Sequence, residues 1–214
     1  AVTGGLTTAA FRMPNNQATL SLIKTFGKPI VGPSANTSGK PSPTLAKHVY
    51  HDLHGKIAAI LDDGPTKLGV ESTVIDLSVD VPTILRPGMI DSDDLLKVID
   101  NVNSDHHKVS AGEVPKAPGM KYKHYAPSAQ VIIVDDVNDF KQAIAEYVAK
   151  DVSMGGMATD EILKEVPAGI ETFSLGNDVY SASRDLFAAL RQLDNEHVQY
   201  ILAQGFSDEG HGAA

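Results

Sequence analysis

The sequence predicts an α/β protein in two parts that are joined by a linker. From residue 130 onward, short apolar runs alternate with amphipathic helical patterns, which is typical of a parallel sheet covered by helices on both faces. The first hundred residues also mix short apolar segments with helical patterns, but their loops are rich in Gly, Pro, Ser and Thr. Residues 101–128 have no periodicity, which indicates a linker. With 214 residues, the chain is long enough for two small cores.

The elements of the first part follow from their apolar spacing. We expect strands over 6–13, 29–31, 57–61, 70–77 and 83–85. We expect helices over 18–26 and 45–51, and a third that begins at Ser92. Thr44 is a suitable N-cap for the second of these helices, because its hydroxyl can accept from a free backbone N–H.

The apolar pattern of the second part predicts a regular alternation of strands and helices. Strands are expected over 131–134, 152–157, 170–173 and 198–203, and helices over 140–148, from 162 and over 180–193. The Gly155-Gly156 pair does not complete a dinucleotide-binding fingerprint, so this pattern alone gives the second part no ligand.

The composition of the chain argues against several kinds of site and of partner. The sequence has no cysteine, which rules out disulfides and thiolate metal sites, and its net charge of −9 disfavours non-specific DNA binding. It shows neither a long apolar run nor a signal-peptide pattern, so we expect no membrane span and a cytoplasmic location. Asp105-His106-His107 is a poor metal candidate, because adjacent histidines point in different directions.

The loop over 32–44, GPSANTSGKPSPT, is the strongest candidate for binding an anion. It lies between an expected strand and an expected helix, where free backbone N–H groups, hydroxyls and the helix dipole can face a phosphate. The same composition also fits an ordinary tight loop.

Two arginines stand at expected strand ends, each close to a proline. They occur in Arg12-Met13-Pro14 and Arg86-Pro87-Gly88, and either could bind a carboxylate or phosphate or simply lie at the surface. The strand segment Glu71-Ser72-Thr73-Val74-Ile75-Asp76 carries hydroxyls that could serve a site or bond across the sheet. The linker segment Lys121-Tyr122-Lys123-His124-Tyr125-Ala126-Pro127 fits a flap over a nucleotide or a solvated linker.

The sequence has no P-loop and no nucleophile elbow. Hydroxyls, arginines and backbone donors remain. Such a set suits a nucleotidyl transfer that depends on positioning and charge neutralisation.

Taken together and in this order, the loop, the two arginine motifs, the 71–76 strand and the segment PGMKYKHYAP over 118–127 resemble the L-threonylcarbamoyladenylate synthase family, in its long two-domain type. The resemblance implies a twisted, mixed YrdC-like sheet with helices, present in part over 1–103. It further implies a linker over 104–128 and a small Rossmann-like parallel α/β domain over 129–214.

The resemblance also implies an activity. The family forms L-threonylcarbamoyl-AMP and pyrophosphate from L-threonine, bicarbonate and ATP, normally with Mg²⁺, for the modification of the tRNA adenosine next to the anticodon. By resemblance, ATP would be held by Thr8, Ser34, Ser42, Arg86 and Tyr125, and threonine by Arg12, Gly32 and Ser72. Asn36 would brace its own loop. The resemblance assigns no covalent catalytic residue and no metal ligand.

One family feature is missing from the printed sequence. The phosphate-binding Lys-x-Arg segment of the family would precede Ala1, so we expect the isolated 214 residues to be a fragment that binds ATP poorly and turns over little.

Two other functions remain open. The first is an RNA-binding module of the same fold, for double-stranded RNA or tRNA, which would dock on the tRNA threonylcarbamoyl-transfer machinery without catalysis of its own. The second is a carbamoyl-transferring relative, which the HYAP linker over 124–127 and the following α/β part disfavour. The second part would support a lid or serve as an interaction domain.

Overall fold

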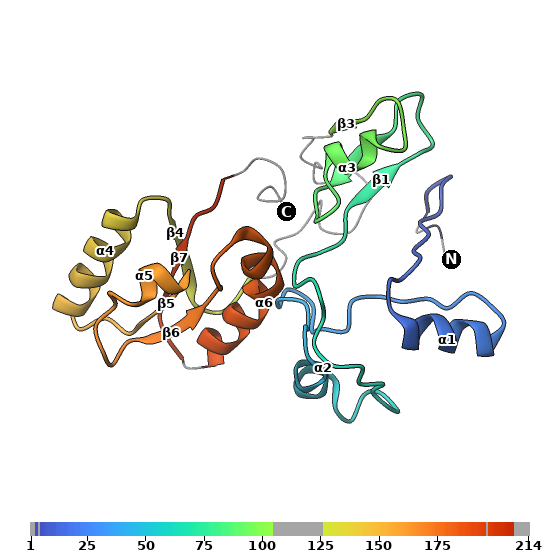
Figure 1. Ribbon diagram of the computed structural model, residues 1–214. Coiled ribbons are helices and arrows are strands. Elements are labelled where there is room, and N and C mark those ends of the chain that lie inside the picture. Colours follow the sequence, from blue (N-terminus) through green and yellow to red (C-terminus); the bar gives the residue numbers. More distant parts are fainter. Residues whose placement is uncertain (1–2, 4, 105–125, 196, 208–214) are drawn as a thin grey trace.

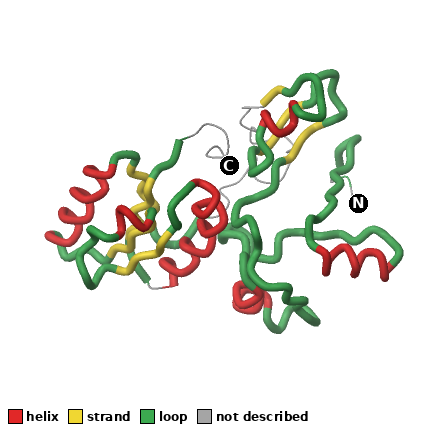
Figure 2. Tube along the Cα trace, viewed as in Figure 1, coloured by secondary structure: helices red, strands yellow, loops and turns green. Residues whose placement is uncertain are grey.

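The computed structural model describes residues 3, 5–104, 126–195 and 197–207. Figure 1 shows the described residues as two parts, with the longest helix of the second part, α6, on the side that faces the first part. Loops make up most of the first part and regular elements most of the second (Figure 2).

The second part contains a four-stranded sheet. Its strands are β4 (Gln130–Val134), β5 (Met154–Ala158), β6 (Glu171–Ser174) and β7 (Tyr200–Gln204). They lie in the order β4-β7-β5-β6, and all three pairings are parallel. Three helices connect them: α4 (Val137–Ala149), α5 (Asp160–Leu163) and α6 (Val179–Asn195). The prediction of a parallel sheet is confirmed.

Helices cover both faces of this sheet because its buried residues alternate. Leu202 packs with Phe140 and Ile144 of α4 in one apolar cluster, and its neighbour Ile201 packs with Leu193 of α6 in the other. All five side chains are 0–2% exposed. Successive strand residues point to opposite faces, so one continuous apolar run serves two cores.

The first part has a smaller sheet, formed by β1 (Val74–Asp76), β2 (Thr83–Arg86) and β3 (Asn103–Ser104). β1 pairs antiparallel with β2, and β2 pairs parallel with β3, so the sheet is mixed, as expected. The helices of this part are α1 (Gln17–Phe26), α2 (Ala46–Leu53) and α3 (Ser92–Leu96). β3 falls within the stretch that the sequence predicts as linker.

Three predicted strands are wrong. Residues 6–13, 29–31 and 57–61 form no strand, and Phe11, Val31 and Leu61 are 92%, 82% and 67% exposed. A strand needs a neighbour to pair with, and no described segment lies beside these three to complete a ladder. Apolar runs alone therefore overpredict strands here.

The start of α2 also differs from the prediction. Leu45, not Thr44, is its N-cap, and no side chain caps it. Thr44 is buried, and its backbone N–H donates to Nδ1 of His48 at 3.2 Å.

The two parts meet at Gly69. Its N–H donates to the Ser183 carbonyl of α6 at 3.0 Å, and a Cβ at this position would overlap the Arg184 carbonyl. Only glycine allows this approach of the first part to the α6 backbone.

Among the described helices, none is long and apolar enough to cross a lipid bilayer.

Candidate functional site

Three of the predicted site residues, Ser42, Ser72 and Arg86, come together around Glu71. The Ser42 hydroxyl donates to Oε1 of Glu71 at 2.5 Å. Nη1 of Arg86 lies 3.7 Å from Oε2 of the same carboxylate. Arg86 also donates to the Ser72 carbonyl through Nε (3.0 Å) and Nη2 (2.7 Å), and Nη2 lies 3.2 Å from the Ser72 hydroxyl. The side chains of Arg86 and Glu71 are 11% and 19% exposed.

The end of β2 positions this arginine. Arg86 is the last residue of β2 and pairs with Val74 of β1, so its side chain lies beside the segment that leads into β1. Gly88 then packs directly against residues 71–73, because a Cβ there would lie 2.6 Å from the Glu71 carbonyl and closer still to the Thr73 nitrogen. The Thr73 hydroxyl donates to the Ile90 carbonyl at 2.6 Å, which also holds the segment after β2 against residues 71–73.

The loop over 32–44 is braced by Asn36, as predicted. Its Nδ2 donates to the carbonyls of Thr37 (3.0 Å) and Lys40 (2.9 Å). Its Oδ1 is buried and accepts no hydrogen bond from the residues the structure describes. A buried acceptor is costly unless a donor reaches it, so the loop offers one acceptor to a donor from elsewhere.

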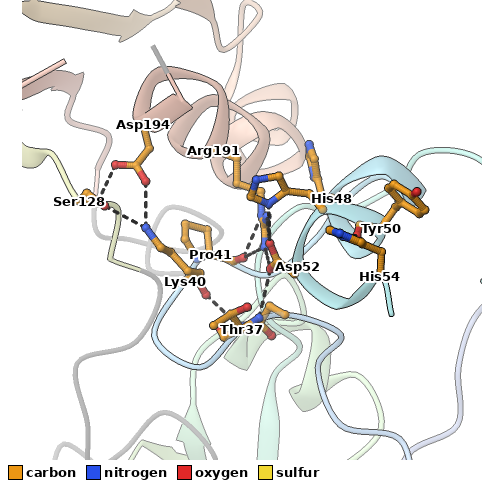
Figure 3. A network of polar contacts seen from close by, with 12 residues as sticks. Thr37, Lys40, Pro41, His48, Tyr50, Asp52, His54, Ser128, Arg191 and Asp194 are labelled. Carbon is orange, nitrogen blue, oxygen red and sulfur yellow. Dashed lines mark hydrogen bonds and ion pairs between the residues drawn. The ribbon is translucent and has the colours of Figure 1, made fainter. Parts of the chain in front are cut away.

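Arg191 of α6 holds both ends of the loop segment 37–42 (Figure 3). It donates to the Pro41 carbonyl from Nε (3.0 Å) and Nη2 (2.6 Å), and to the Asp52 carboxylate from Nη1 (3.1 Å) and Nη2 (2.7 Å). The same carboxylate accepts from the Thr37 N–H at 3.1 Å. The side chains of Arg191 and Asp52 are only 10% and 4% exposed, so the ion pair is poorly screened by solvent.

The pair governs the charge of Asp52. Burial raises the pKa of this carboxyl, but hydrogen bonds from Arg191, His51 and the Thr37 N–H outweigh burial and hold the pKa below its usual range. Asp52 is therefore ionised at neutral pH.

A second ion pair joins the loop to the C-terminal end of α6. Lys40 Nζ lies 3.1 Å from Oδ2 of Asp194 and donates to the Ser128 hydroxyl at 3.0 Å. Asp194 also accepts from the backbone N–H groups of Ser128 (2.5 Å) and Ala129 (3.1 Å). Burial raises the pKa of Asp194, but the Ala129 N–H and Lys40 outweigh it and lower that pKa.

A pocket of about 520 Å³ lies between α2 and α6, beside these contacts. Lys47 and His48 line it from α2, and Arg191 and Gln192 from α6. Burial, together with the charges of Arg191 and Lys47, lowers the pKa of His48 to about 4. The pocket therefore presents a neutral imidazole at pH 7.

The structure does not join the other predicted site residues to the cluster. Thr8, Arg12, Gly32 and Ser34 are exposed and lie in irregular segments, and no hydrogen bond or ion pair between described residues joins them to Glu71 or Arg86. Tyr125 lies outside the described residues. No group of three or more His, Cys, Asp or Glu side chains suited to a metal ion occurs in the described part of the chain.

No sequence pattern marks Asp52, Arg191 and Asp194 as the residues that hold the loop. Asp52 and Arg191 are 139 positions apart, and each lies on a helix that carries other charges. Only their spatial proximity identifies them.

Comparison with known families completes the description. The model of the threonylcarbamoyl-AMP synthase C-terminal domain matches residues 90–214, more than half of the chain. The chain belongs to the threonylcarbamoyl-AMP synthase family. A second model, described as telomere recombination, matches residues 1–88 of this synthase-family chain.

Curated relatives carry the same family name. The threonylcarbamoyl-AMP synthase of Pyrococcus abyssi is 46% identical and that of Bacillus subtilis 41% identical, each across 100% of this chain. The crystal structure of P. abyssi Sua5 complexed with L-threonine superposes with a TM-score of 0.89 at 42% identity, over 98% of this chain. The chain spans 63% and 62% of the two curated relatives, respectively, and 62% of the chain in the crystal structure, which is less than two thirds of each.

Proposed function

We propose that this protein is a nucleotidyltransferase that forms L-threonylcarbamoyl-AMP and pyrophosphate from L-threonine, bicarbonate and ATP. The cluster of Ser42, Ser72 and Arg86 around Glu71 carries the proposal. It places a guanidinium and two hydroxyls, drawn from three separate segments, at one place. The family name shared by its relatives supports the same reaction.

The chemistry demands such a cluster. The amine of L-threonine forms an N–C bond to the carbon of bicarbonate, and water leaves, which gives a carbamate. An oxygen of this carbamate bonds to the α-phosphorus of ATP, and the bond from that phosphorus to the pyrophosphate oxygen breaks. Negative charge spreads over the phosphoryl oxygens during this exchange, so positioned cations and donors lower the barrier more than acid–base groups do. Arg86 supplies the fixed cation, because Ser72 holds two of its nitrogens.

The predicted site residues fall into two groups, one for each substrate. Thr8, Ser34, Ser42, Arg86 and Tyr125 would bind ATP, and Arg12, Gly32 and Ser72 would bind threonine. The buried Oδ1 of Asn36 supports a ligand at the loop, since a ribose hydroxyl or an amino group could donate to it. The L-threonine complex of the P. abyssi relative supports the threonine assignment. In this scheme residues 1–103 form the catalytic part, 104–128 the linker and 129–214 the supporting domain.

The cluster would hold Mg²⁺ only together with the bound nucleotide. Glu71 is the one carboxylate that the described residues bring to the cluster, and Mg²⁺ is commonly held by one or two carboxylates together with substrate phosphates and water. Glu71 and the Ser42 hydroxyl would therefore hold the ion together with the nucleotide. When bound, Mg²⁺ neutralises phosphate charge.

The product would serve the tRNA adenosine next to the anticodon, passed on by the tRNA threonylcarbamoyl-transfer machinery. We place the reaction in the cytoplasm, where ATP and tRNA are available together.

The test is threonine-dependent pyrophosphate release by the protein encoded in the complete reading frame that contains this sequence. Arg86→Met should lower kcat/KM by about 10²- to 10³-fold, the usual cost of losing a transition-state donor. Arg184→Met is the matched control, because this exposed arginine of α6 pairs with its neighbour Asp185.

Two results would contradict the proposal. One is an unsubstituted protein in which threonine causes no pyrophosphate release, and the other is full activity of Arg86→Met. A protein without turnover that still shifts tRNA on a gel, with steep salt dependence, would favour the RNA-binding alternative.

A further inference from the structure

Helix α6 of the second part reaches the loop that carries Ser42. Arg191 donates two hydrogen bonds to the carbonyl of Pro41, the residue directly before Ser42. Pro41 is less than 2% exposed, so this carbonyl has no solvent to replace the guanidinium. The arginine thus fixes the backbone at one end of the segment 37–42.

The other end of the segment is fixed through Asp52. Its carboxylate receives Arg191 on both oxygens and the Thr37 N–H on one of them. Arg191 is therefore the shared partner of both ends, directly at Pro41 and indirectly at Thr37. Figure 3 shows Asp52 of α2 between Arg191 of α6 and Thr37 of the loop, with Asp194 of α6 facing Lys40.

The position of this backbone determines where the Ser42 hydroxyl points. Ser42 donates to Glu71, and Glu71 in turn faces Arg86. A shift of Pro41 would move Ser42 away from Glu71 and loosen the carboxylate that faces the arginine. A path of direct contacts thus runs from α6 to the phosphate-binding cluster.

Lys40 also links the loop to α6, but more weakly. Its ion pair with Asp194 is partly exposed, 40% at the lysine, so solvent screens it more than the Arg191 pair. Arg191 is the stronger candidate for controlling the loop.

We infer that Arg191 is a positioning residue for nucleotide binding, and that the second part thereby assembles the ATP site from outside the catalytic part. The inference rests on the proposed function. It requires the affinity for ATP, but not for threonine, to depend on Arg191, because the threonine residues Arg12, Gly32 and Ser72 lie outside the segment 37–42.

The experiment compares Arg191→Met, Asp52→Asn and the control Arg184→Met in the protein from the complete reading frame. Arg191→Met should raise KM for ATP about 10-fold or more, since small displacements of site residues cost up to about 10²-fold. KM for threonine should stay unchanged. Asp52→Asn should raise KM for ATP less, because the Pro41 contact survives.

A general loss of stability would give a different result. It would reduce the active fraction, and hence kcat, without changing either KM. Should Arg191→Met fail to fold, Arg191→Lys keeps the charge but loses the forked donor pair, and it should still raise KM for ATP.

Hydrogen–deuterium exchange gives a second readout that needs no turnover. The Thr37 N–H donates to the Asp52 carboxylate of α2 at 3.1 Å, and the Lys40 N–H donates to the Thr37 carbonyl within the loop at 3.1 Å. Both should exchange faster in Arg191→Met, while those in α1 keep their rates.

Unchanged exchange at Thr37 and Lys40, or an unchanged KM for ATP in an active Arg191→Met, would overturn the inference alone. An inactive unsubstituted protein would instead overturn the proposed function, and the inference with it.

Discussion

Gly88 shows how a single residue without a side chain shapes the candidate site. It lies two residues after Arg86 and packs against the backbone of 71–73, where the Glu71 carbonyl would be 2.6 Å from an added Cβ. Interiors are packed as densely as crystals, so a methyl group has no room here. The close approach keeps Glu71 and Ser72 within reach of Arg86.

Gly88→Ala should therefore destabilise the protein by about 1–3 kcal/mol, the usual cost of overpacking. Denaturant unfolding would measure the change. Gly32→Ala is the control for stability, because no heavy atom lies within 4 Å of a Cβ at Gly32. Equal stability of the two variants would contradict the packing argument.

Residue types suggested part of the site in advance. Ser42, Ser72 and Arg86 stood out because hydroxyls and an arginine before a proline are suited to anions, and the structure brings these three together. The stabilising partners could not be predicted, because Asp52 and Arg191 look like ordinary helix charges until the fold joins them. Whether Ser42, Ser72 and Arg86 bind substrate stays a prediction, as it does for the other candidates, Thr8, Arg12, Gly32, Ser34 and Tyr125.

At the scale of elements, periodicity predicted the second part better than the first. Its four strands and three helices were all expected within a few residues, because each strand has neighbours and each helix has an apolar face to bury. In the first part, 6–13, 29–31 and 57–61 look like strands by composition but have no described partner. Local sequence cannot reveal a missing neighbour, since pairing is a long-range property.

The burial of His48 beside Arg191 and Lys47 predicts a pH dependence of stability. The fold lowers the pKa of His48 from 6.5 to about 4, so between these values the unfolded chain binds a proton that the folded chain does not. Stability is then fully present above pH 6.5 and falls as the pH drops toward 4. Asp52, whose pKa is also lowered, adds a loss at more acid pH.

Thermal unfolding between pH 6.5 and 4 would measure this dependence. The midpoint should fall with pH, and His48→Gln should flatten the decline, because glutamine takes up no proton. A decline of equal steepness in His48→Gln would assign the effect to other groups.

At the scale of the whole molecule, the two parts differ in how they are stabilised. Both clusters of buried apolar residues belong to the second part, within residues 129–206. The first part instead exposes several large apolar side chains, among them Phe11 at 92% and Met13 at 87%. Burial of apolar area is the main favourable term in folding, so the second part has its own source of stability.

Residues 126–207 should consequently fold alone. Expressed separately, they should unfold in one cooperative transition with a midpoint close to that of the same region in the whole chain. Circular dichroism during heating would test this. A gradual, non-cooperative change would mean that the second part depends on its contacts with Gly69 and Asp52.

The strand order has a consequence for synthesis. β7 is the last strand of its sheet in sequence, yet it lies between β4 and β5 and is hydrogen-bonded to both. While a ribosome is still making the chain, β4 and the β5–β6 pair have no common neighbour, and apolar residues of both faces remain uncovered. The sheet can close only after residue 204 has left the exit tunnel, so β4 and the β5–β6 pair cannot complete their folding while β7 is still being made.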